Sequence, residues 1–190
     1  MPLSLLPRAI SLVVAAGILA GCTPQQTPEP QDVPATLQPL QPRSDELAID
    51  ALPQVERGTQ EACPYLDTQF VAEANGQRMT DYGVDARFDP PACVFYSYPD
   101  APQVIVMVRH LESFEQAMEV IDFAAPIDAT SPAEYGSWEG GRGTLADSPA
   151  GPGSVFAVAK DATAVTVWSN QEQSIKAETI AQRVIDNLDL

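Results

Sequence analysis

Residues 9–20 form an uncharged, largely apolar run near the N-terminus, and this run determines which part of the chain remains to fold as a domain. The residues before it contain one base, Arg8, and no acid. A basic start, a short apolar run and small residues before a cut are typical of a signal peptide. A membrane-spanning helix needs about 20 apolar residues, and this run is much shorter. We therefore expect residues 1–21 to be a signal peptide; the alternative is a retained transmembrane helix.

The run ends in Leu19-Ala20-Gly21-Cys22, which resembles the lipobox of bacterial lipoproteins. The resemblance implies that the Cys22 thiol receives a diacylglycerol, that cleavage makes Cys22 the new N-terminus, and that fatty acids such as palmitate anchor the protein. Each buried methylene contributes about 0.8 kcal/mol, so two acyl chains hold a domain firmly at a membrane. We expect an exported protein, lipid-anchored at the outer face of the cytoplasmic membrane in the cell envelope. The alternative is an ordinary secretory peptide with an incidental cysteine.

The chain is strongly acidic, with a formal net charge of −16. Arg8 is the only charged residue before Cys22, so the mature chain is more negative still. Such a surface disfavours nucleic acid and anionic lipid headgroups as partners. The simplest interpretation is a solvated acidic face on an exported protein.

Cys63 and Cys93 remain as a pair once Cys22 is acylated. In an oxidising compartment such a pair is expected to form a disulfide. The bond would close a loop of about 31 residues and stabilise the fold by about 3–4 kcal/mol. A metal or redox pair is the alternative, but no C-x-x-C motif is present and the only histidine, His110, is remote in sequence. We expect no cofactor and no metal.

Residues 22–60 are rich in proline and polar residues and poor in apolar ones. Such a composition cannot bury enough apolar area to offset the entropy of ordering. We expect a disordered tether with an average reach of roughly 35 Å. Near its end, Leu47, Ile49 and Leu52 could dock onto the domain, which we expect to span residues 61–190.

The rest of the chain alternates between helical and strand patterns. Apolar spacing and caps predict helices at 64–74 and 114–125 and another after Asn170 or Ser174. Strands are predicted at 93–98 and 104–108, and a hairpin at 155–159 and 164–168. This order predicts an α+β fold: a mainly antiparallel sheet of about four to six strands with helices packed on it.

Three further features allow two interpretations each. Asp81, Asp85 and Asp89 lie in a solvated loop or short edge strand, or less readily in a cation site. The glycine-rich stretch 140–143 predicts a strand pair or irregular loop rather than an anion cradle, because no helix signal follows it. Trp138 is either a core anchor, which we favour, or an exposed contact residue.

Three short motifs carry a family resemblance: Cys63-Pro64-Tyr65, Arg87-Phe88-Asp89-Pro90-Pro91-Ala92-Cys93 and Trp168-Ser169-Asn170-Gln171. With them, residues 61–190 resemble a domain-of-unknown-function family of actinobacterial envelope lipoproteins. A looser similarity links the domain to PsbP-like α/β/α sandwiches. The resemblance implies no established activity and no catalytic residues; PsbP-like domains are often accessory to larger assemblies.

Three functional hypotheses follow. The first is a non-catalytic binding or accessory domain for an envelope protein or glycan, with Tyr96, Tyr98, Trp138 and Arg142 as candidate contact residues. The second is an extracytoplasmic, hydrolase-like enzyme that uses His110 or paired carboxylates. The third is a structural spacer, which a domain without an apolar pocket or exposed patch would favour.

Overall fold

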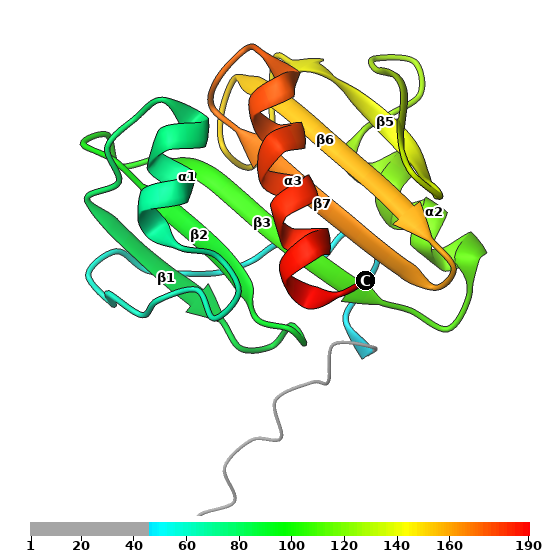
Figure 1. Ribbon diagram of the computed structural model, residues 1–190, viewed down its shortest axis with the longest axis horizontal. Coiled ribbons are helices and arrows are strands. Elements are labelled where there is room, and N and C mark those ends of the chain that lie inside the picture. The colour runs from blue at the N-terminus through cyan, green and yellow to red at the C-terminus, as the bar shows by residue number, and fades with distance from the viewer. Residues whose placement is uncertain (1–45) are drawn as a thin grey trace, which may run out of the picture. The chain divides into compact units, whose positions relative to one another are not determined.

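The computed structural model describes residues 46–190, and within this range the chain forms an antiparallel sheet of seven strands with three helices (Figure 1). The strands are β1 (Asp81–Asp85), β2 (Ala92–Tyr96), β3 (Pro102–His110), β4 (Ser131–Tyr135), β5 (Trp138–Leu145), β6 (Gly153–Lys160) and β7 (Thr163–Ser169). The helices are α1 (Thr68–Asn75), α2 (Phe114–Ala124) and α3 (Ser174–Leu188). None of these helices is long and apolar enough to cross a bilayer. The Cys22 prediction lies outside the described residues.

The strand order is β1-β2-β3-β7-β6-β5-β4, and every neighbouring pair is antiparallel. Helices α1 and α3 lie on one face of the sheet and α2 on the other, so the domain has three layers (Figure 1). The expected α+β fold is confirmed, with one strand more than the upper end of the expected range. Kinship with PsbP-like sandwiches stays a prediction.

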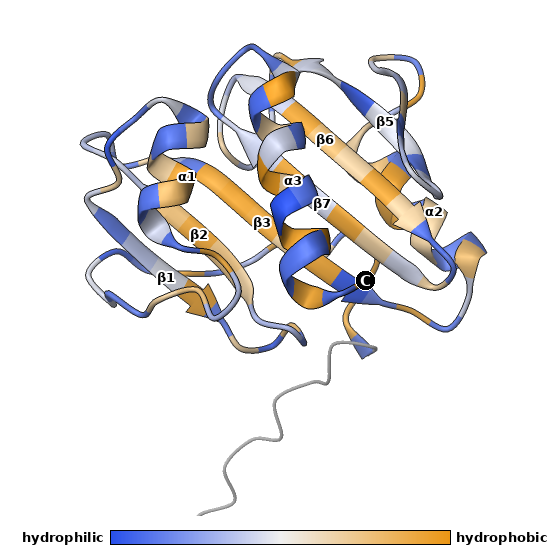
Figure 2. Cartoon of the chain, viewed as in Figure 1, coloured by the Kyte–Doolittle hydropathy of each residue, from blue (hydrophilic) through white to orange (hydrophobic). Residues whose placement is uncertain are grey.

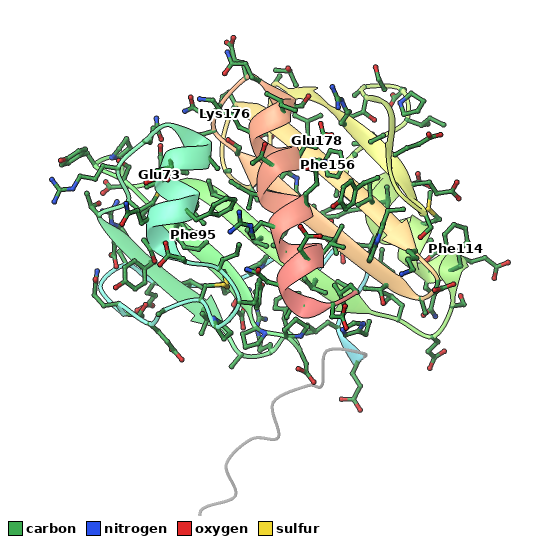
Figure 3. All side chains as sticks on the ribbon, in the orientation of Figure 1. Glu73, Phe95, Phe114, Phe156, Lys176 and Glu178 are labelled. Atoms are coloured by element: carbon green, nitrogen blue, oxygen red, sulfur yellow. A yellow bond between two sulfur atoms is a disulfide. The ribbon has the colours of Figure 1, made fainter. Side chains whose placement is uncertain are left out.

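The central strands feed two separate cores. Along β3, Val104, Val106 and Val108 pack under α1 and α3, while the alternating Ile105 and Met107 pack under α2. Both faces are covered, which explains why this stretch of the sequence is apolar throughout. Figure 2 shows the hydrophobic colouring concentrated in the middle of the sheet. Figure 3 shows Phe95 and Phe156 in the layer beneath α1 and α3.

The predicted disulfide is present: Cys63 and Cys93 are bonded, with their Cα atoms 5.6 Å apart. The bond ties the segment before α1 to strand β2. The predicted helix at 64–74 begins later, at Thr68, because Asp67 caps it by accepting a hydrogen bond from the Phe70 N–H at 2.9 Å. Tyr65 instead lies in the core and donates to the Pro91 carbonyl at 2.8 Å.

Strands β4 and β5 form a hairpin in the span where the sequence predicts a strand pair or an irregular loop. Its glycine-rich stretch 140–143 is a strand, as predicted, and the glycines are there for close packing. A Cβ on Gly140 would lie 2.1 Å from the Ala157 carbonyl oxygen on β6, and one on Gly141 would lie 3.0 Å from the Ala125 Cβ. A side chain at either position would push against neighbouring structure.

Both edges of the sheet are protected against pairing with another chain. β4 is short and carries Pro132 and the exposed Glu134, two features that discourage edge pairing. At the other edge, Thr59 donates to the Tyr82 carbonyl of β1 at 3.2 Å, so the chain before the domain covers this strand.

That covering segment, residues 46–60, is called the strap here. Leu47, Ile49, Leu52 and Val55 are half-buried against the α2-side core, so the docking considered from the sequence does occur. Packed chain thus begins before residue 61, where we expected the domain to start. The sequence gives little sign that the strap is packed, because its apolar residues are few. Its attachment depends largely on hydrogen bonds to its backbone.

Arg109 on β3 makes the innermost attachment of the strap. Its fully buried guanidinium donates to the Leu47 carbonyl at 2.9 Å and the Ala48 carbonyl at 3.1 Å. The same group lies over the Phe88 ring, 5.8 Å from its centroid. A buried cation is costly unless it is hydrogen-bonded, so the strap backbone is part of what makes Arg109 tolerable inside the domain.

Further hydrogen bonds continue along the strap. Tyr96 donates to the Val55 carbonyl at 2.7 Å, and Asp81 accepts from the Gly58 N–H and the Gln60 side-chain amide at 2.6 Å each. Arg57 donates to the Ser97 carbonyl at 2.8 Å and also to the Pro99 carbonyl. The strap is therefore fastened at intervals across the sheet.

Asp85 and Arg87 hold the middle of the strap. The Asp85 carboxylate accepts from the Gln54 N–H at 2.8 Å and pairs with Arg87 at 2.6 Å, and Arg87 donates to the Leu52 carbonyl at 3.2 Å. Burial raises the pKa of Asp85, but hydrogen bonds from the Arg87 side chain and from the Gln54 and Arg87 N–H groups outweigh it. The net pKa of this carboxyl is below its ordinary value.

Acid should therefore loosen the strap through Asp85. A carboxyl with a depressed folded-state pKa stabilises the fold above its unfolded pKa and loses that contribution as the pH falls through the folded value. We expect the free energy of unfolding to fall as the pH drops below about 4, the ordinary aspartate pKa. The Asp85→Asn variant should be less stable than the parent at pH 7, and its free energy of unfolding should fall less on acidification. Equal pH slopes for the two proteins in urea titrations would contradict this.

Candidate functional site

The four contact residues predicted from the sequence do not converge. Tyr96 is buried and holds the strap, while Tyr98, just beyond β2, is 74% exposed. Trp138 on β5 is a core residue, as favoured, and Arg142 on the same strand pairs with Glu178 of α3 at 2.5 Å. Three strands separate β2 from β5 in the sheet. A contact role for these residues stays a prediction, and they make no joint site.

His110 lies at the exposed end of β3, with its Nδ1 3.0 Å from the Thr163 hydroxyl. Two of the three aspartates considered for a cation, Asp81 and Asp85, accept hydrogen bonds from the strap, and Asp85 is also paired with Arg87. Across residues 46–190 no group of three or more histidine, cysteine, aspartate or glutamate side chains is arranged to hold a metal ion.

The apolar face around α2 offers a different kind of site. The helix is oriented by its N-cap, where the Ser113 hydroxyl accepts from the Gln116 N–H at 3.3 Å and the Gln116 side chain accepts from the Glu112 N–H at 3.0 Å. Its inner face buries small and branched side chains against β6 and β7: Ala117, Val120, Ile121 and Ala124. With these residues buried, Phe123 is left at the helix margin, 40% exposed.

A pocket of about 450 Å³ opens beside the C-terminal turn of α2. Its lining comes from the strap, the helix end, the β5–β6 connection and the central strand β7: Leu52, Phe123, Ala124, Pro126, Leu145, Asp147, Ser148, Pro149 and Trp168. Trp168 is 1% exposed, so most of its large ring belongs to the core. The size and largely apolar lining are those of small-molecule or side-chain binding pockets.

The β5–β6 wall of the pocket is held in place by its own turn. The Gly151 N–H donates to the Ser148 carbonyl at 2.8 Å, and the Ser148 hydroxyl donates to the Gly151 carbonyl at 2.6 Å. Ala150 is buried in the α2-side core, which fixes the turn from below. The pocket wall is thus preformed, and the one hydroxyl-bearing side chain in its lining is engaged with the backbone.

A second hollow of about 150 Å³ lies on the other side of the helix end, lined by residues of α2, β4 and β5 that include Met118 and Asp122. Ile127 also lines it and is 88% exposed. Together, the pocket, this hollow and the exposed Phe123 and Ile127 between them are called the α2 pocket surface. Its preformed apolar shape can bind an apolar group.

A wider hollow of about 530 Å³ lies on the opposite side of the sheet, beside the disulfide. It is lined by residues 62–68 together with Asn187 and Leu188. This lining is mostly the chain leading into α1, and none of the large apolar side chains exposed on the described domain belongs to it. We therefore regard the α2 pocket surface as the stronger candidate site.

One feature of the sequence points to this surface, although it is not part of the apolar periodicity that predicted the helix. In α2, Phe123 falls outside the apolar face made by Ala117, Ile121 and Ala125, and Ile127 follows the helix-ending Pro126. Aromatic and branched residues at such positions are either exposed or line a neighbouring cavity. The remaining lining comes from segments far apart in sequence, which no local pattern joins.

The family motifs have scaffold roles in this structure. Arg87 and Phe88 lie at the strap, Cys63 and Cys93 form the disulfide, and Trp168 forms part of the core and of the pocket. A family model described as Domain of unknown function (DUF2020) matches residues 47–190. No curated protein matches the chain.

Proposed function

The chain belongs to the family described as Domain of unknown function (DUF2020), and on that premise we propose that it is a lipid-anchored cell-envelope protein with a non-catalytic binding domain. The α2 pocket surface is its binding site. The observation that carries this function is the preformed apolar pocket beside Trp168, with Phe123 exposed at its margin and Ile127 exposed nearby. A domain acting only as a spacer has no need of such a surface.

The N-terminal sequence supports the anchor. Residues 1–21 have the pattern of a signal peptide, and Cys22 stands at the lipidation position of the lipobox it resembles. Residues 23–45 then lie between the lipidation position and the strap in the sequence. The disulfide suits an exported domain, because such bonds persist in oxidising compartments.

The enzyme hypothesis has no specific observation in its favour. His110 contacts a threonine hydroxyl at a strand end, and the carboxylates of Asp81 and Asp85 hold the strap. The pocket lining contains Asp147 and Ser148 as its polar side chains, and the Ser148 hydroxyl donates to its own turn. Binding is the role that the pocket supports best.

The anchor is tested by mass spectrometry of the mature protein. We expect a chain that begins at Cys22 and carries a diacylglycerol, and a membrane fraction that retains it. Cys22→Ser should release the protein into the soluble fraction with its fold intact. An unmodified Cys22 in the mature wild-type chain would refute the anchored form.

The binding site is tested by chemical crosslinking in intact cells with matched variants. Phe123→Ser and Ile127→Ser should each remove a specific crosslinked product, because they take apolar contact area from the α2 pocket surface. Ile175→Ser on α3 is the matched control, since Ile175 is 56% exposed but lies on the other face of the sheet. Thermal melts check that the variants are folded. A product that persists equally in all three variants would refute the site.

A further inference from the structure

Exposed apolar side chains gather on the α2 layer. Of the five large apolar residues exposed on the described domain, three lie on α2 or directly after it: Phe114, Phe123 and Ile127. Phe114 points outward at the periphery in Figure 3. The other two, Tyr98 and Ile175, lie apart from this layer at the end of β2 and on α3.

The helix α2 and the chain that follows it carry charge of one sign only. From residue 111 to residue 141 the chain contains no lysine or arginine, while its acids are Glu112, Glu115, Glu119, Asp122, Asp128, Glu134 and Glu139. On the helix, Glu115, Glu119 and Asp122 are exposed and follow one another at spacings of four and three, which places them on one side. None of these acids takes part in an ion pair within residues 46–190.

The acids reach the edge of the hollows themselves. Asp147 lines the larger pocket and Asp122 lines the smaller hollow, so a carboxylate stands on each side of the Phe123–Ile127 turn. By contrast, α3 on the opposite face mixes signs: it carries Lys176 and Arg183, and its Glu178 is paired with Arg142. The one-sided charge is therefore a local property of residues 111–141 as well as a consequence of the acidic composition. The base beside the pocket lining, Arg87 at Leu52, is paired with Asp85.

We propose that the occupant of the α2 pocket surface is a basic segment of a partner protein, in which lysine or arginine side chains flank an apolar side chain. This inference rests on the proposed binding function and names the chemistry of the partner. The apolar side chain enters the pocket beside Trp168, and the basic groups meet Asp122, Asp147 and the acids of α2. Complementary charge steers such a partner to the site and sets its orientation, while burial of the apolar side chain holds it.

A membrane surface is a poor occupant of the same site. Anionic lipid headgroups attract basic protein surfaces and would repel the acids around this pocket. In a protein held by its N-terminal lipid, this repulsion favours orientations in which the α2 pocket surface faces away from the bilayer. That leaves the surface open to another protein.

The test uses the full mature chain carrying Cys22→Ser, so that no lipid is needed, and three synthetic helical peptides. The first is an amphipathic peptide of leucine and lysine; the second replaces leucine by serine; the third replaces lysine by glutamate. Binding is measured by calorimetry, and the site is mapped by amide chemical-shift changes. We expect the leucine–lysine peptide to bind at least tenfold more tightly than either control, with shifts at Phe123, Ile127 and Trp168. Its affinity should fall as salt is raised, as expected for exposed charges.

Variants separate specific docking from general attraction to an acidic protein. Phe123→Ser and the paired change Asp122→Lys with Asp147→Lys should each weaken the leucine–lysine peptide at least fivefold, and Ile175→Ser should leave its affinity unchanged. Equal binding of the serine–lysine peptide, or unchanged binding to Phe123→Ser, would overturn the proposal by showing attraction through charge alone.

Two further outcomes would also overturn it. If the pocket resonances move when residues 23–45 are deleted, the chain's own tether occupies the surface. If sedimentation shows a dimer that Ile127→Ser dissociates, a second copy is the occupant. Preference for the leucine–glutamate peptide would contradict the proposed positive charge of the partner segment. It would leave the proposed binding function standing, because the pocket-dependent crosslink in cells would still support that function.

Discussion

A chain that begins at residue 61 is expected to lose its folded state, whereas a chain that begins at residue 46 should keep it. Removal of the strap exposes the α2-side core that Leu47, Ile49, Leu52 and Val55 cover. It also takes from Arg109 the Leu47 and Ala48 carbonyls, which accept hydrogen bonds from its guanidinium. Full burial of an apolar side chain contributes about 1.5–3 kcal/mol, so each of these half-buried side chains contributes about half of that, and a buried polar group that loses its hydrogen bond costs about 1–3 kcal/mol.

The sum is comparable to the total stability of an ordinary domain, which is about 5–15 kcal/mol. Circular dichroism and thermal melts of the two truncated chains measure the effect, with the full mature chain as reference. Arg109→Lys is a milder variant that tests the same attachment. Lysine keeps the positive charge but lacks the planar guanidinium that donates to both carbonyls, so we expect a smaller loss of stability. A chain from residue 61 that melts cooperatively within a few degrees of the full chain would contradict this role of the strap.

Loss of the disulfide should produce the next largest effect. Replacing Cys63 and Cys93 together by alanine should lower the free energy of unfolding by about 3–4 kcal/mol, since the bond closes a loop of 30 residues in sequence separation. The bond also joins the chain before α1 to β2, the neighbour of the edge strand β1, where Cys93 is fully buried. Much of this loss should come from the unfolded state, because the unfolded chain gains conformational entropy once the loop is open.

Urea unfolding of the double variant and of the oxidised parent, both with Cys22→Ser, gives this difference directly. The parent in reductant should approach the double variant once the bond has been reduced in denaturant, which separates loss of the crosslink from loss of the sulfur atoms in the core. A difference below about 1 kcal/mol would show that the loop is already constrained in the unfolded chain.

The sequence predicted those parts of the fold that depend on local patterns. The run 104–108 became the central strand β3, the runs around Asp161 became the β6–β7 hairpin, and Ser113 capped α2. Asp161 has a positive φ of 50°, the conformation that aspartate tolerates better than most residues. In each case neighbours in sequence determine the structure, so periodicity and capping chemistry are sufficient.

Other parts depend on contacts between distant segments, which local patterns do not contain. The sequence left the β4–β5 hairpin open between a strand pair and an irregular loop, because Ala133, Gly140 and Gly141 are too small to produce an apolar alternation. Of the two caps predicted for the last helix, Ser174 is off by one residue, because the helix begins there and Gln173 is its N-cap; Asn170 instead hydrogen-bonds Gln103 on β3. Small residues and polar side chains take their roles here from the neighbours that the fold supplies.

The strap and the pocket are the clearest cases. Arg109 appears in sequence as a lone base after an apolar run, and nothing local shows that its partners are backbone carbonyls 61 and 62 residues earlier. The pocket joins Leu52, Phe123, Leu145 and Trp168, which the fold alone brings together. The contact residues predicted instead were chosen by residue type, and residue type does not reveal exposure.

The claim that the α2 pocket surface is the working face of this domain is tested most directly by a photoreactive amino acid placed at position 123 of the full chain in intact cells. A second chain carries the same group at position 175, on the opposite face of the sheet. We expect a single crosslinked protein from position 123, attached through a segment rich in lysine or arginine, and no such product from position 175. The same product from both positions, or a product from position 175 alone, would contradict it.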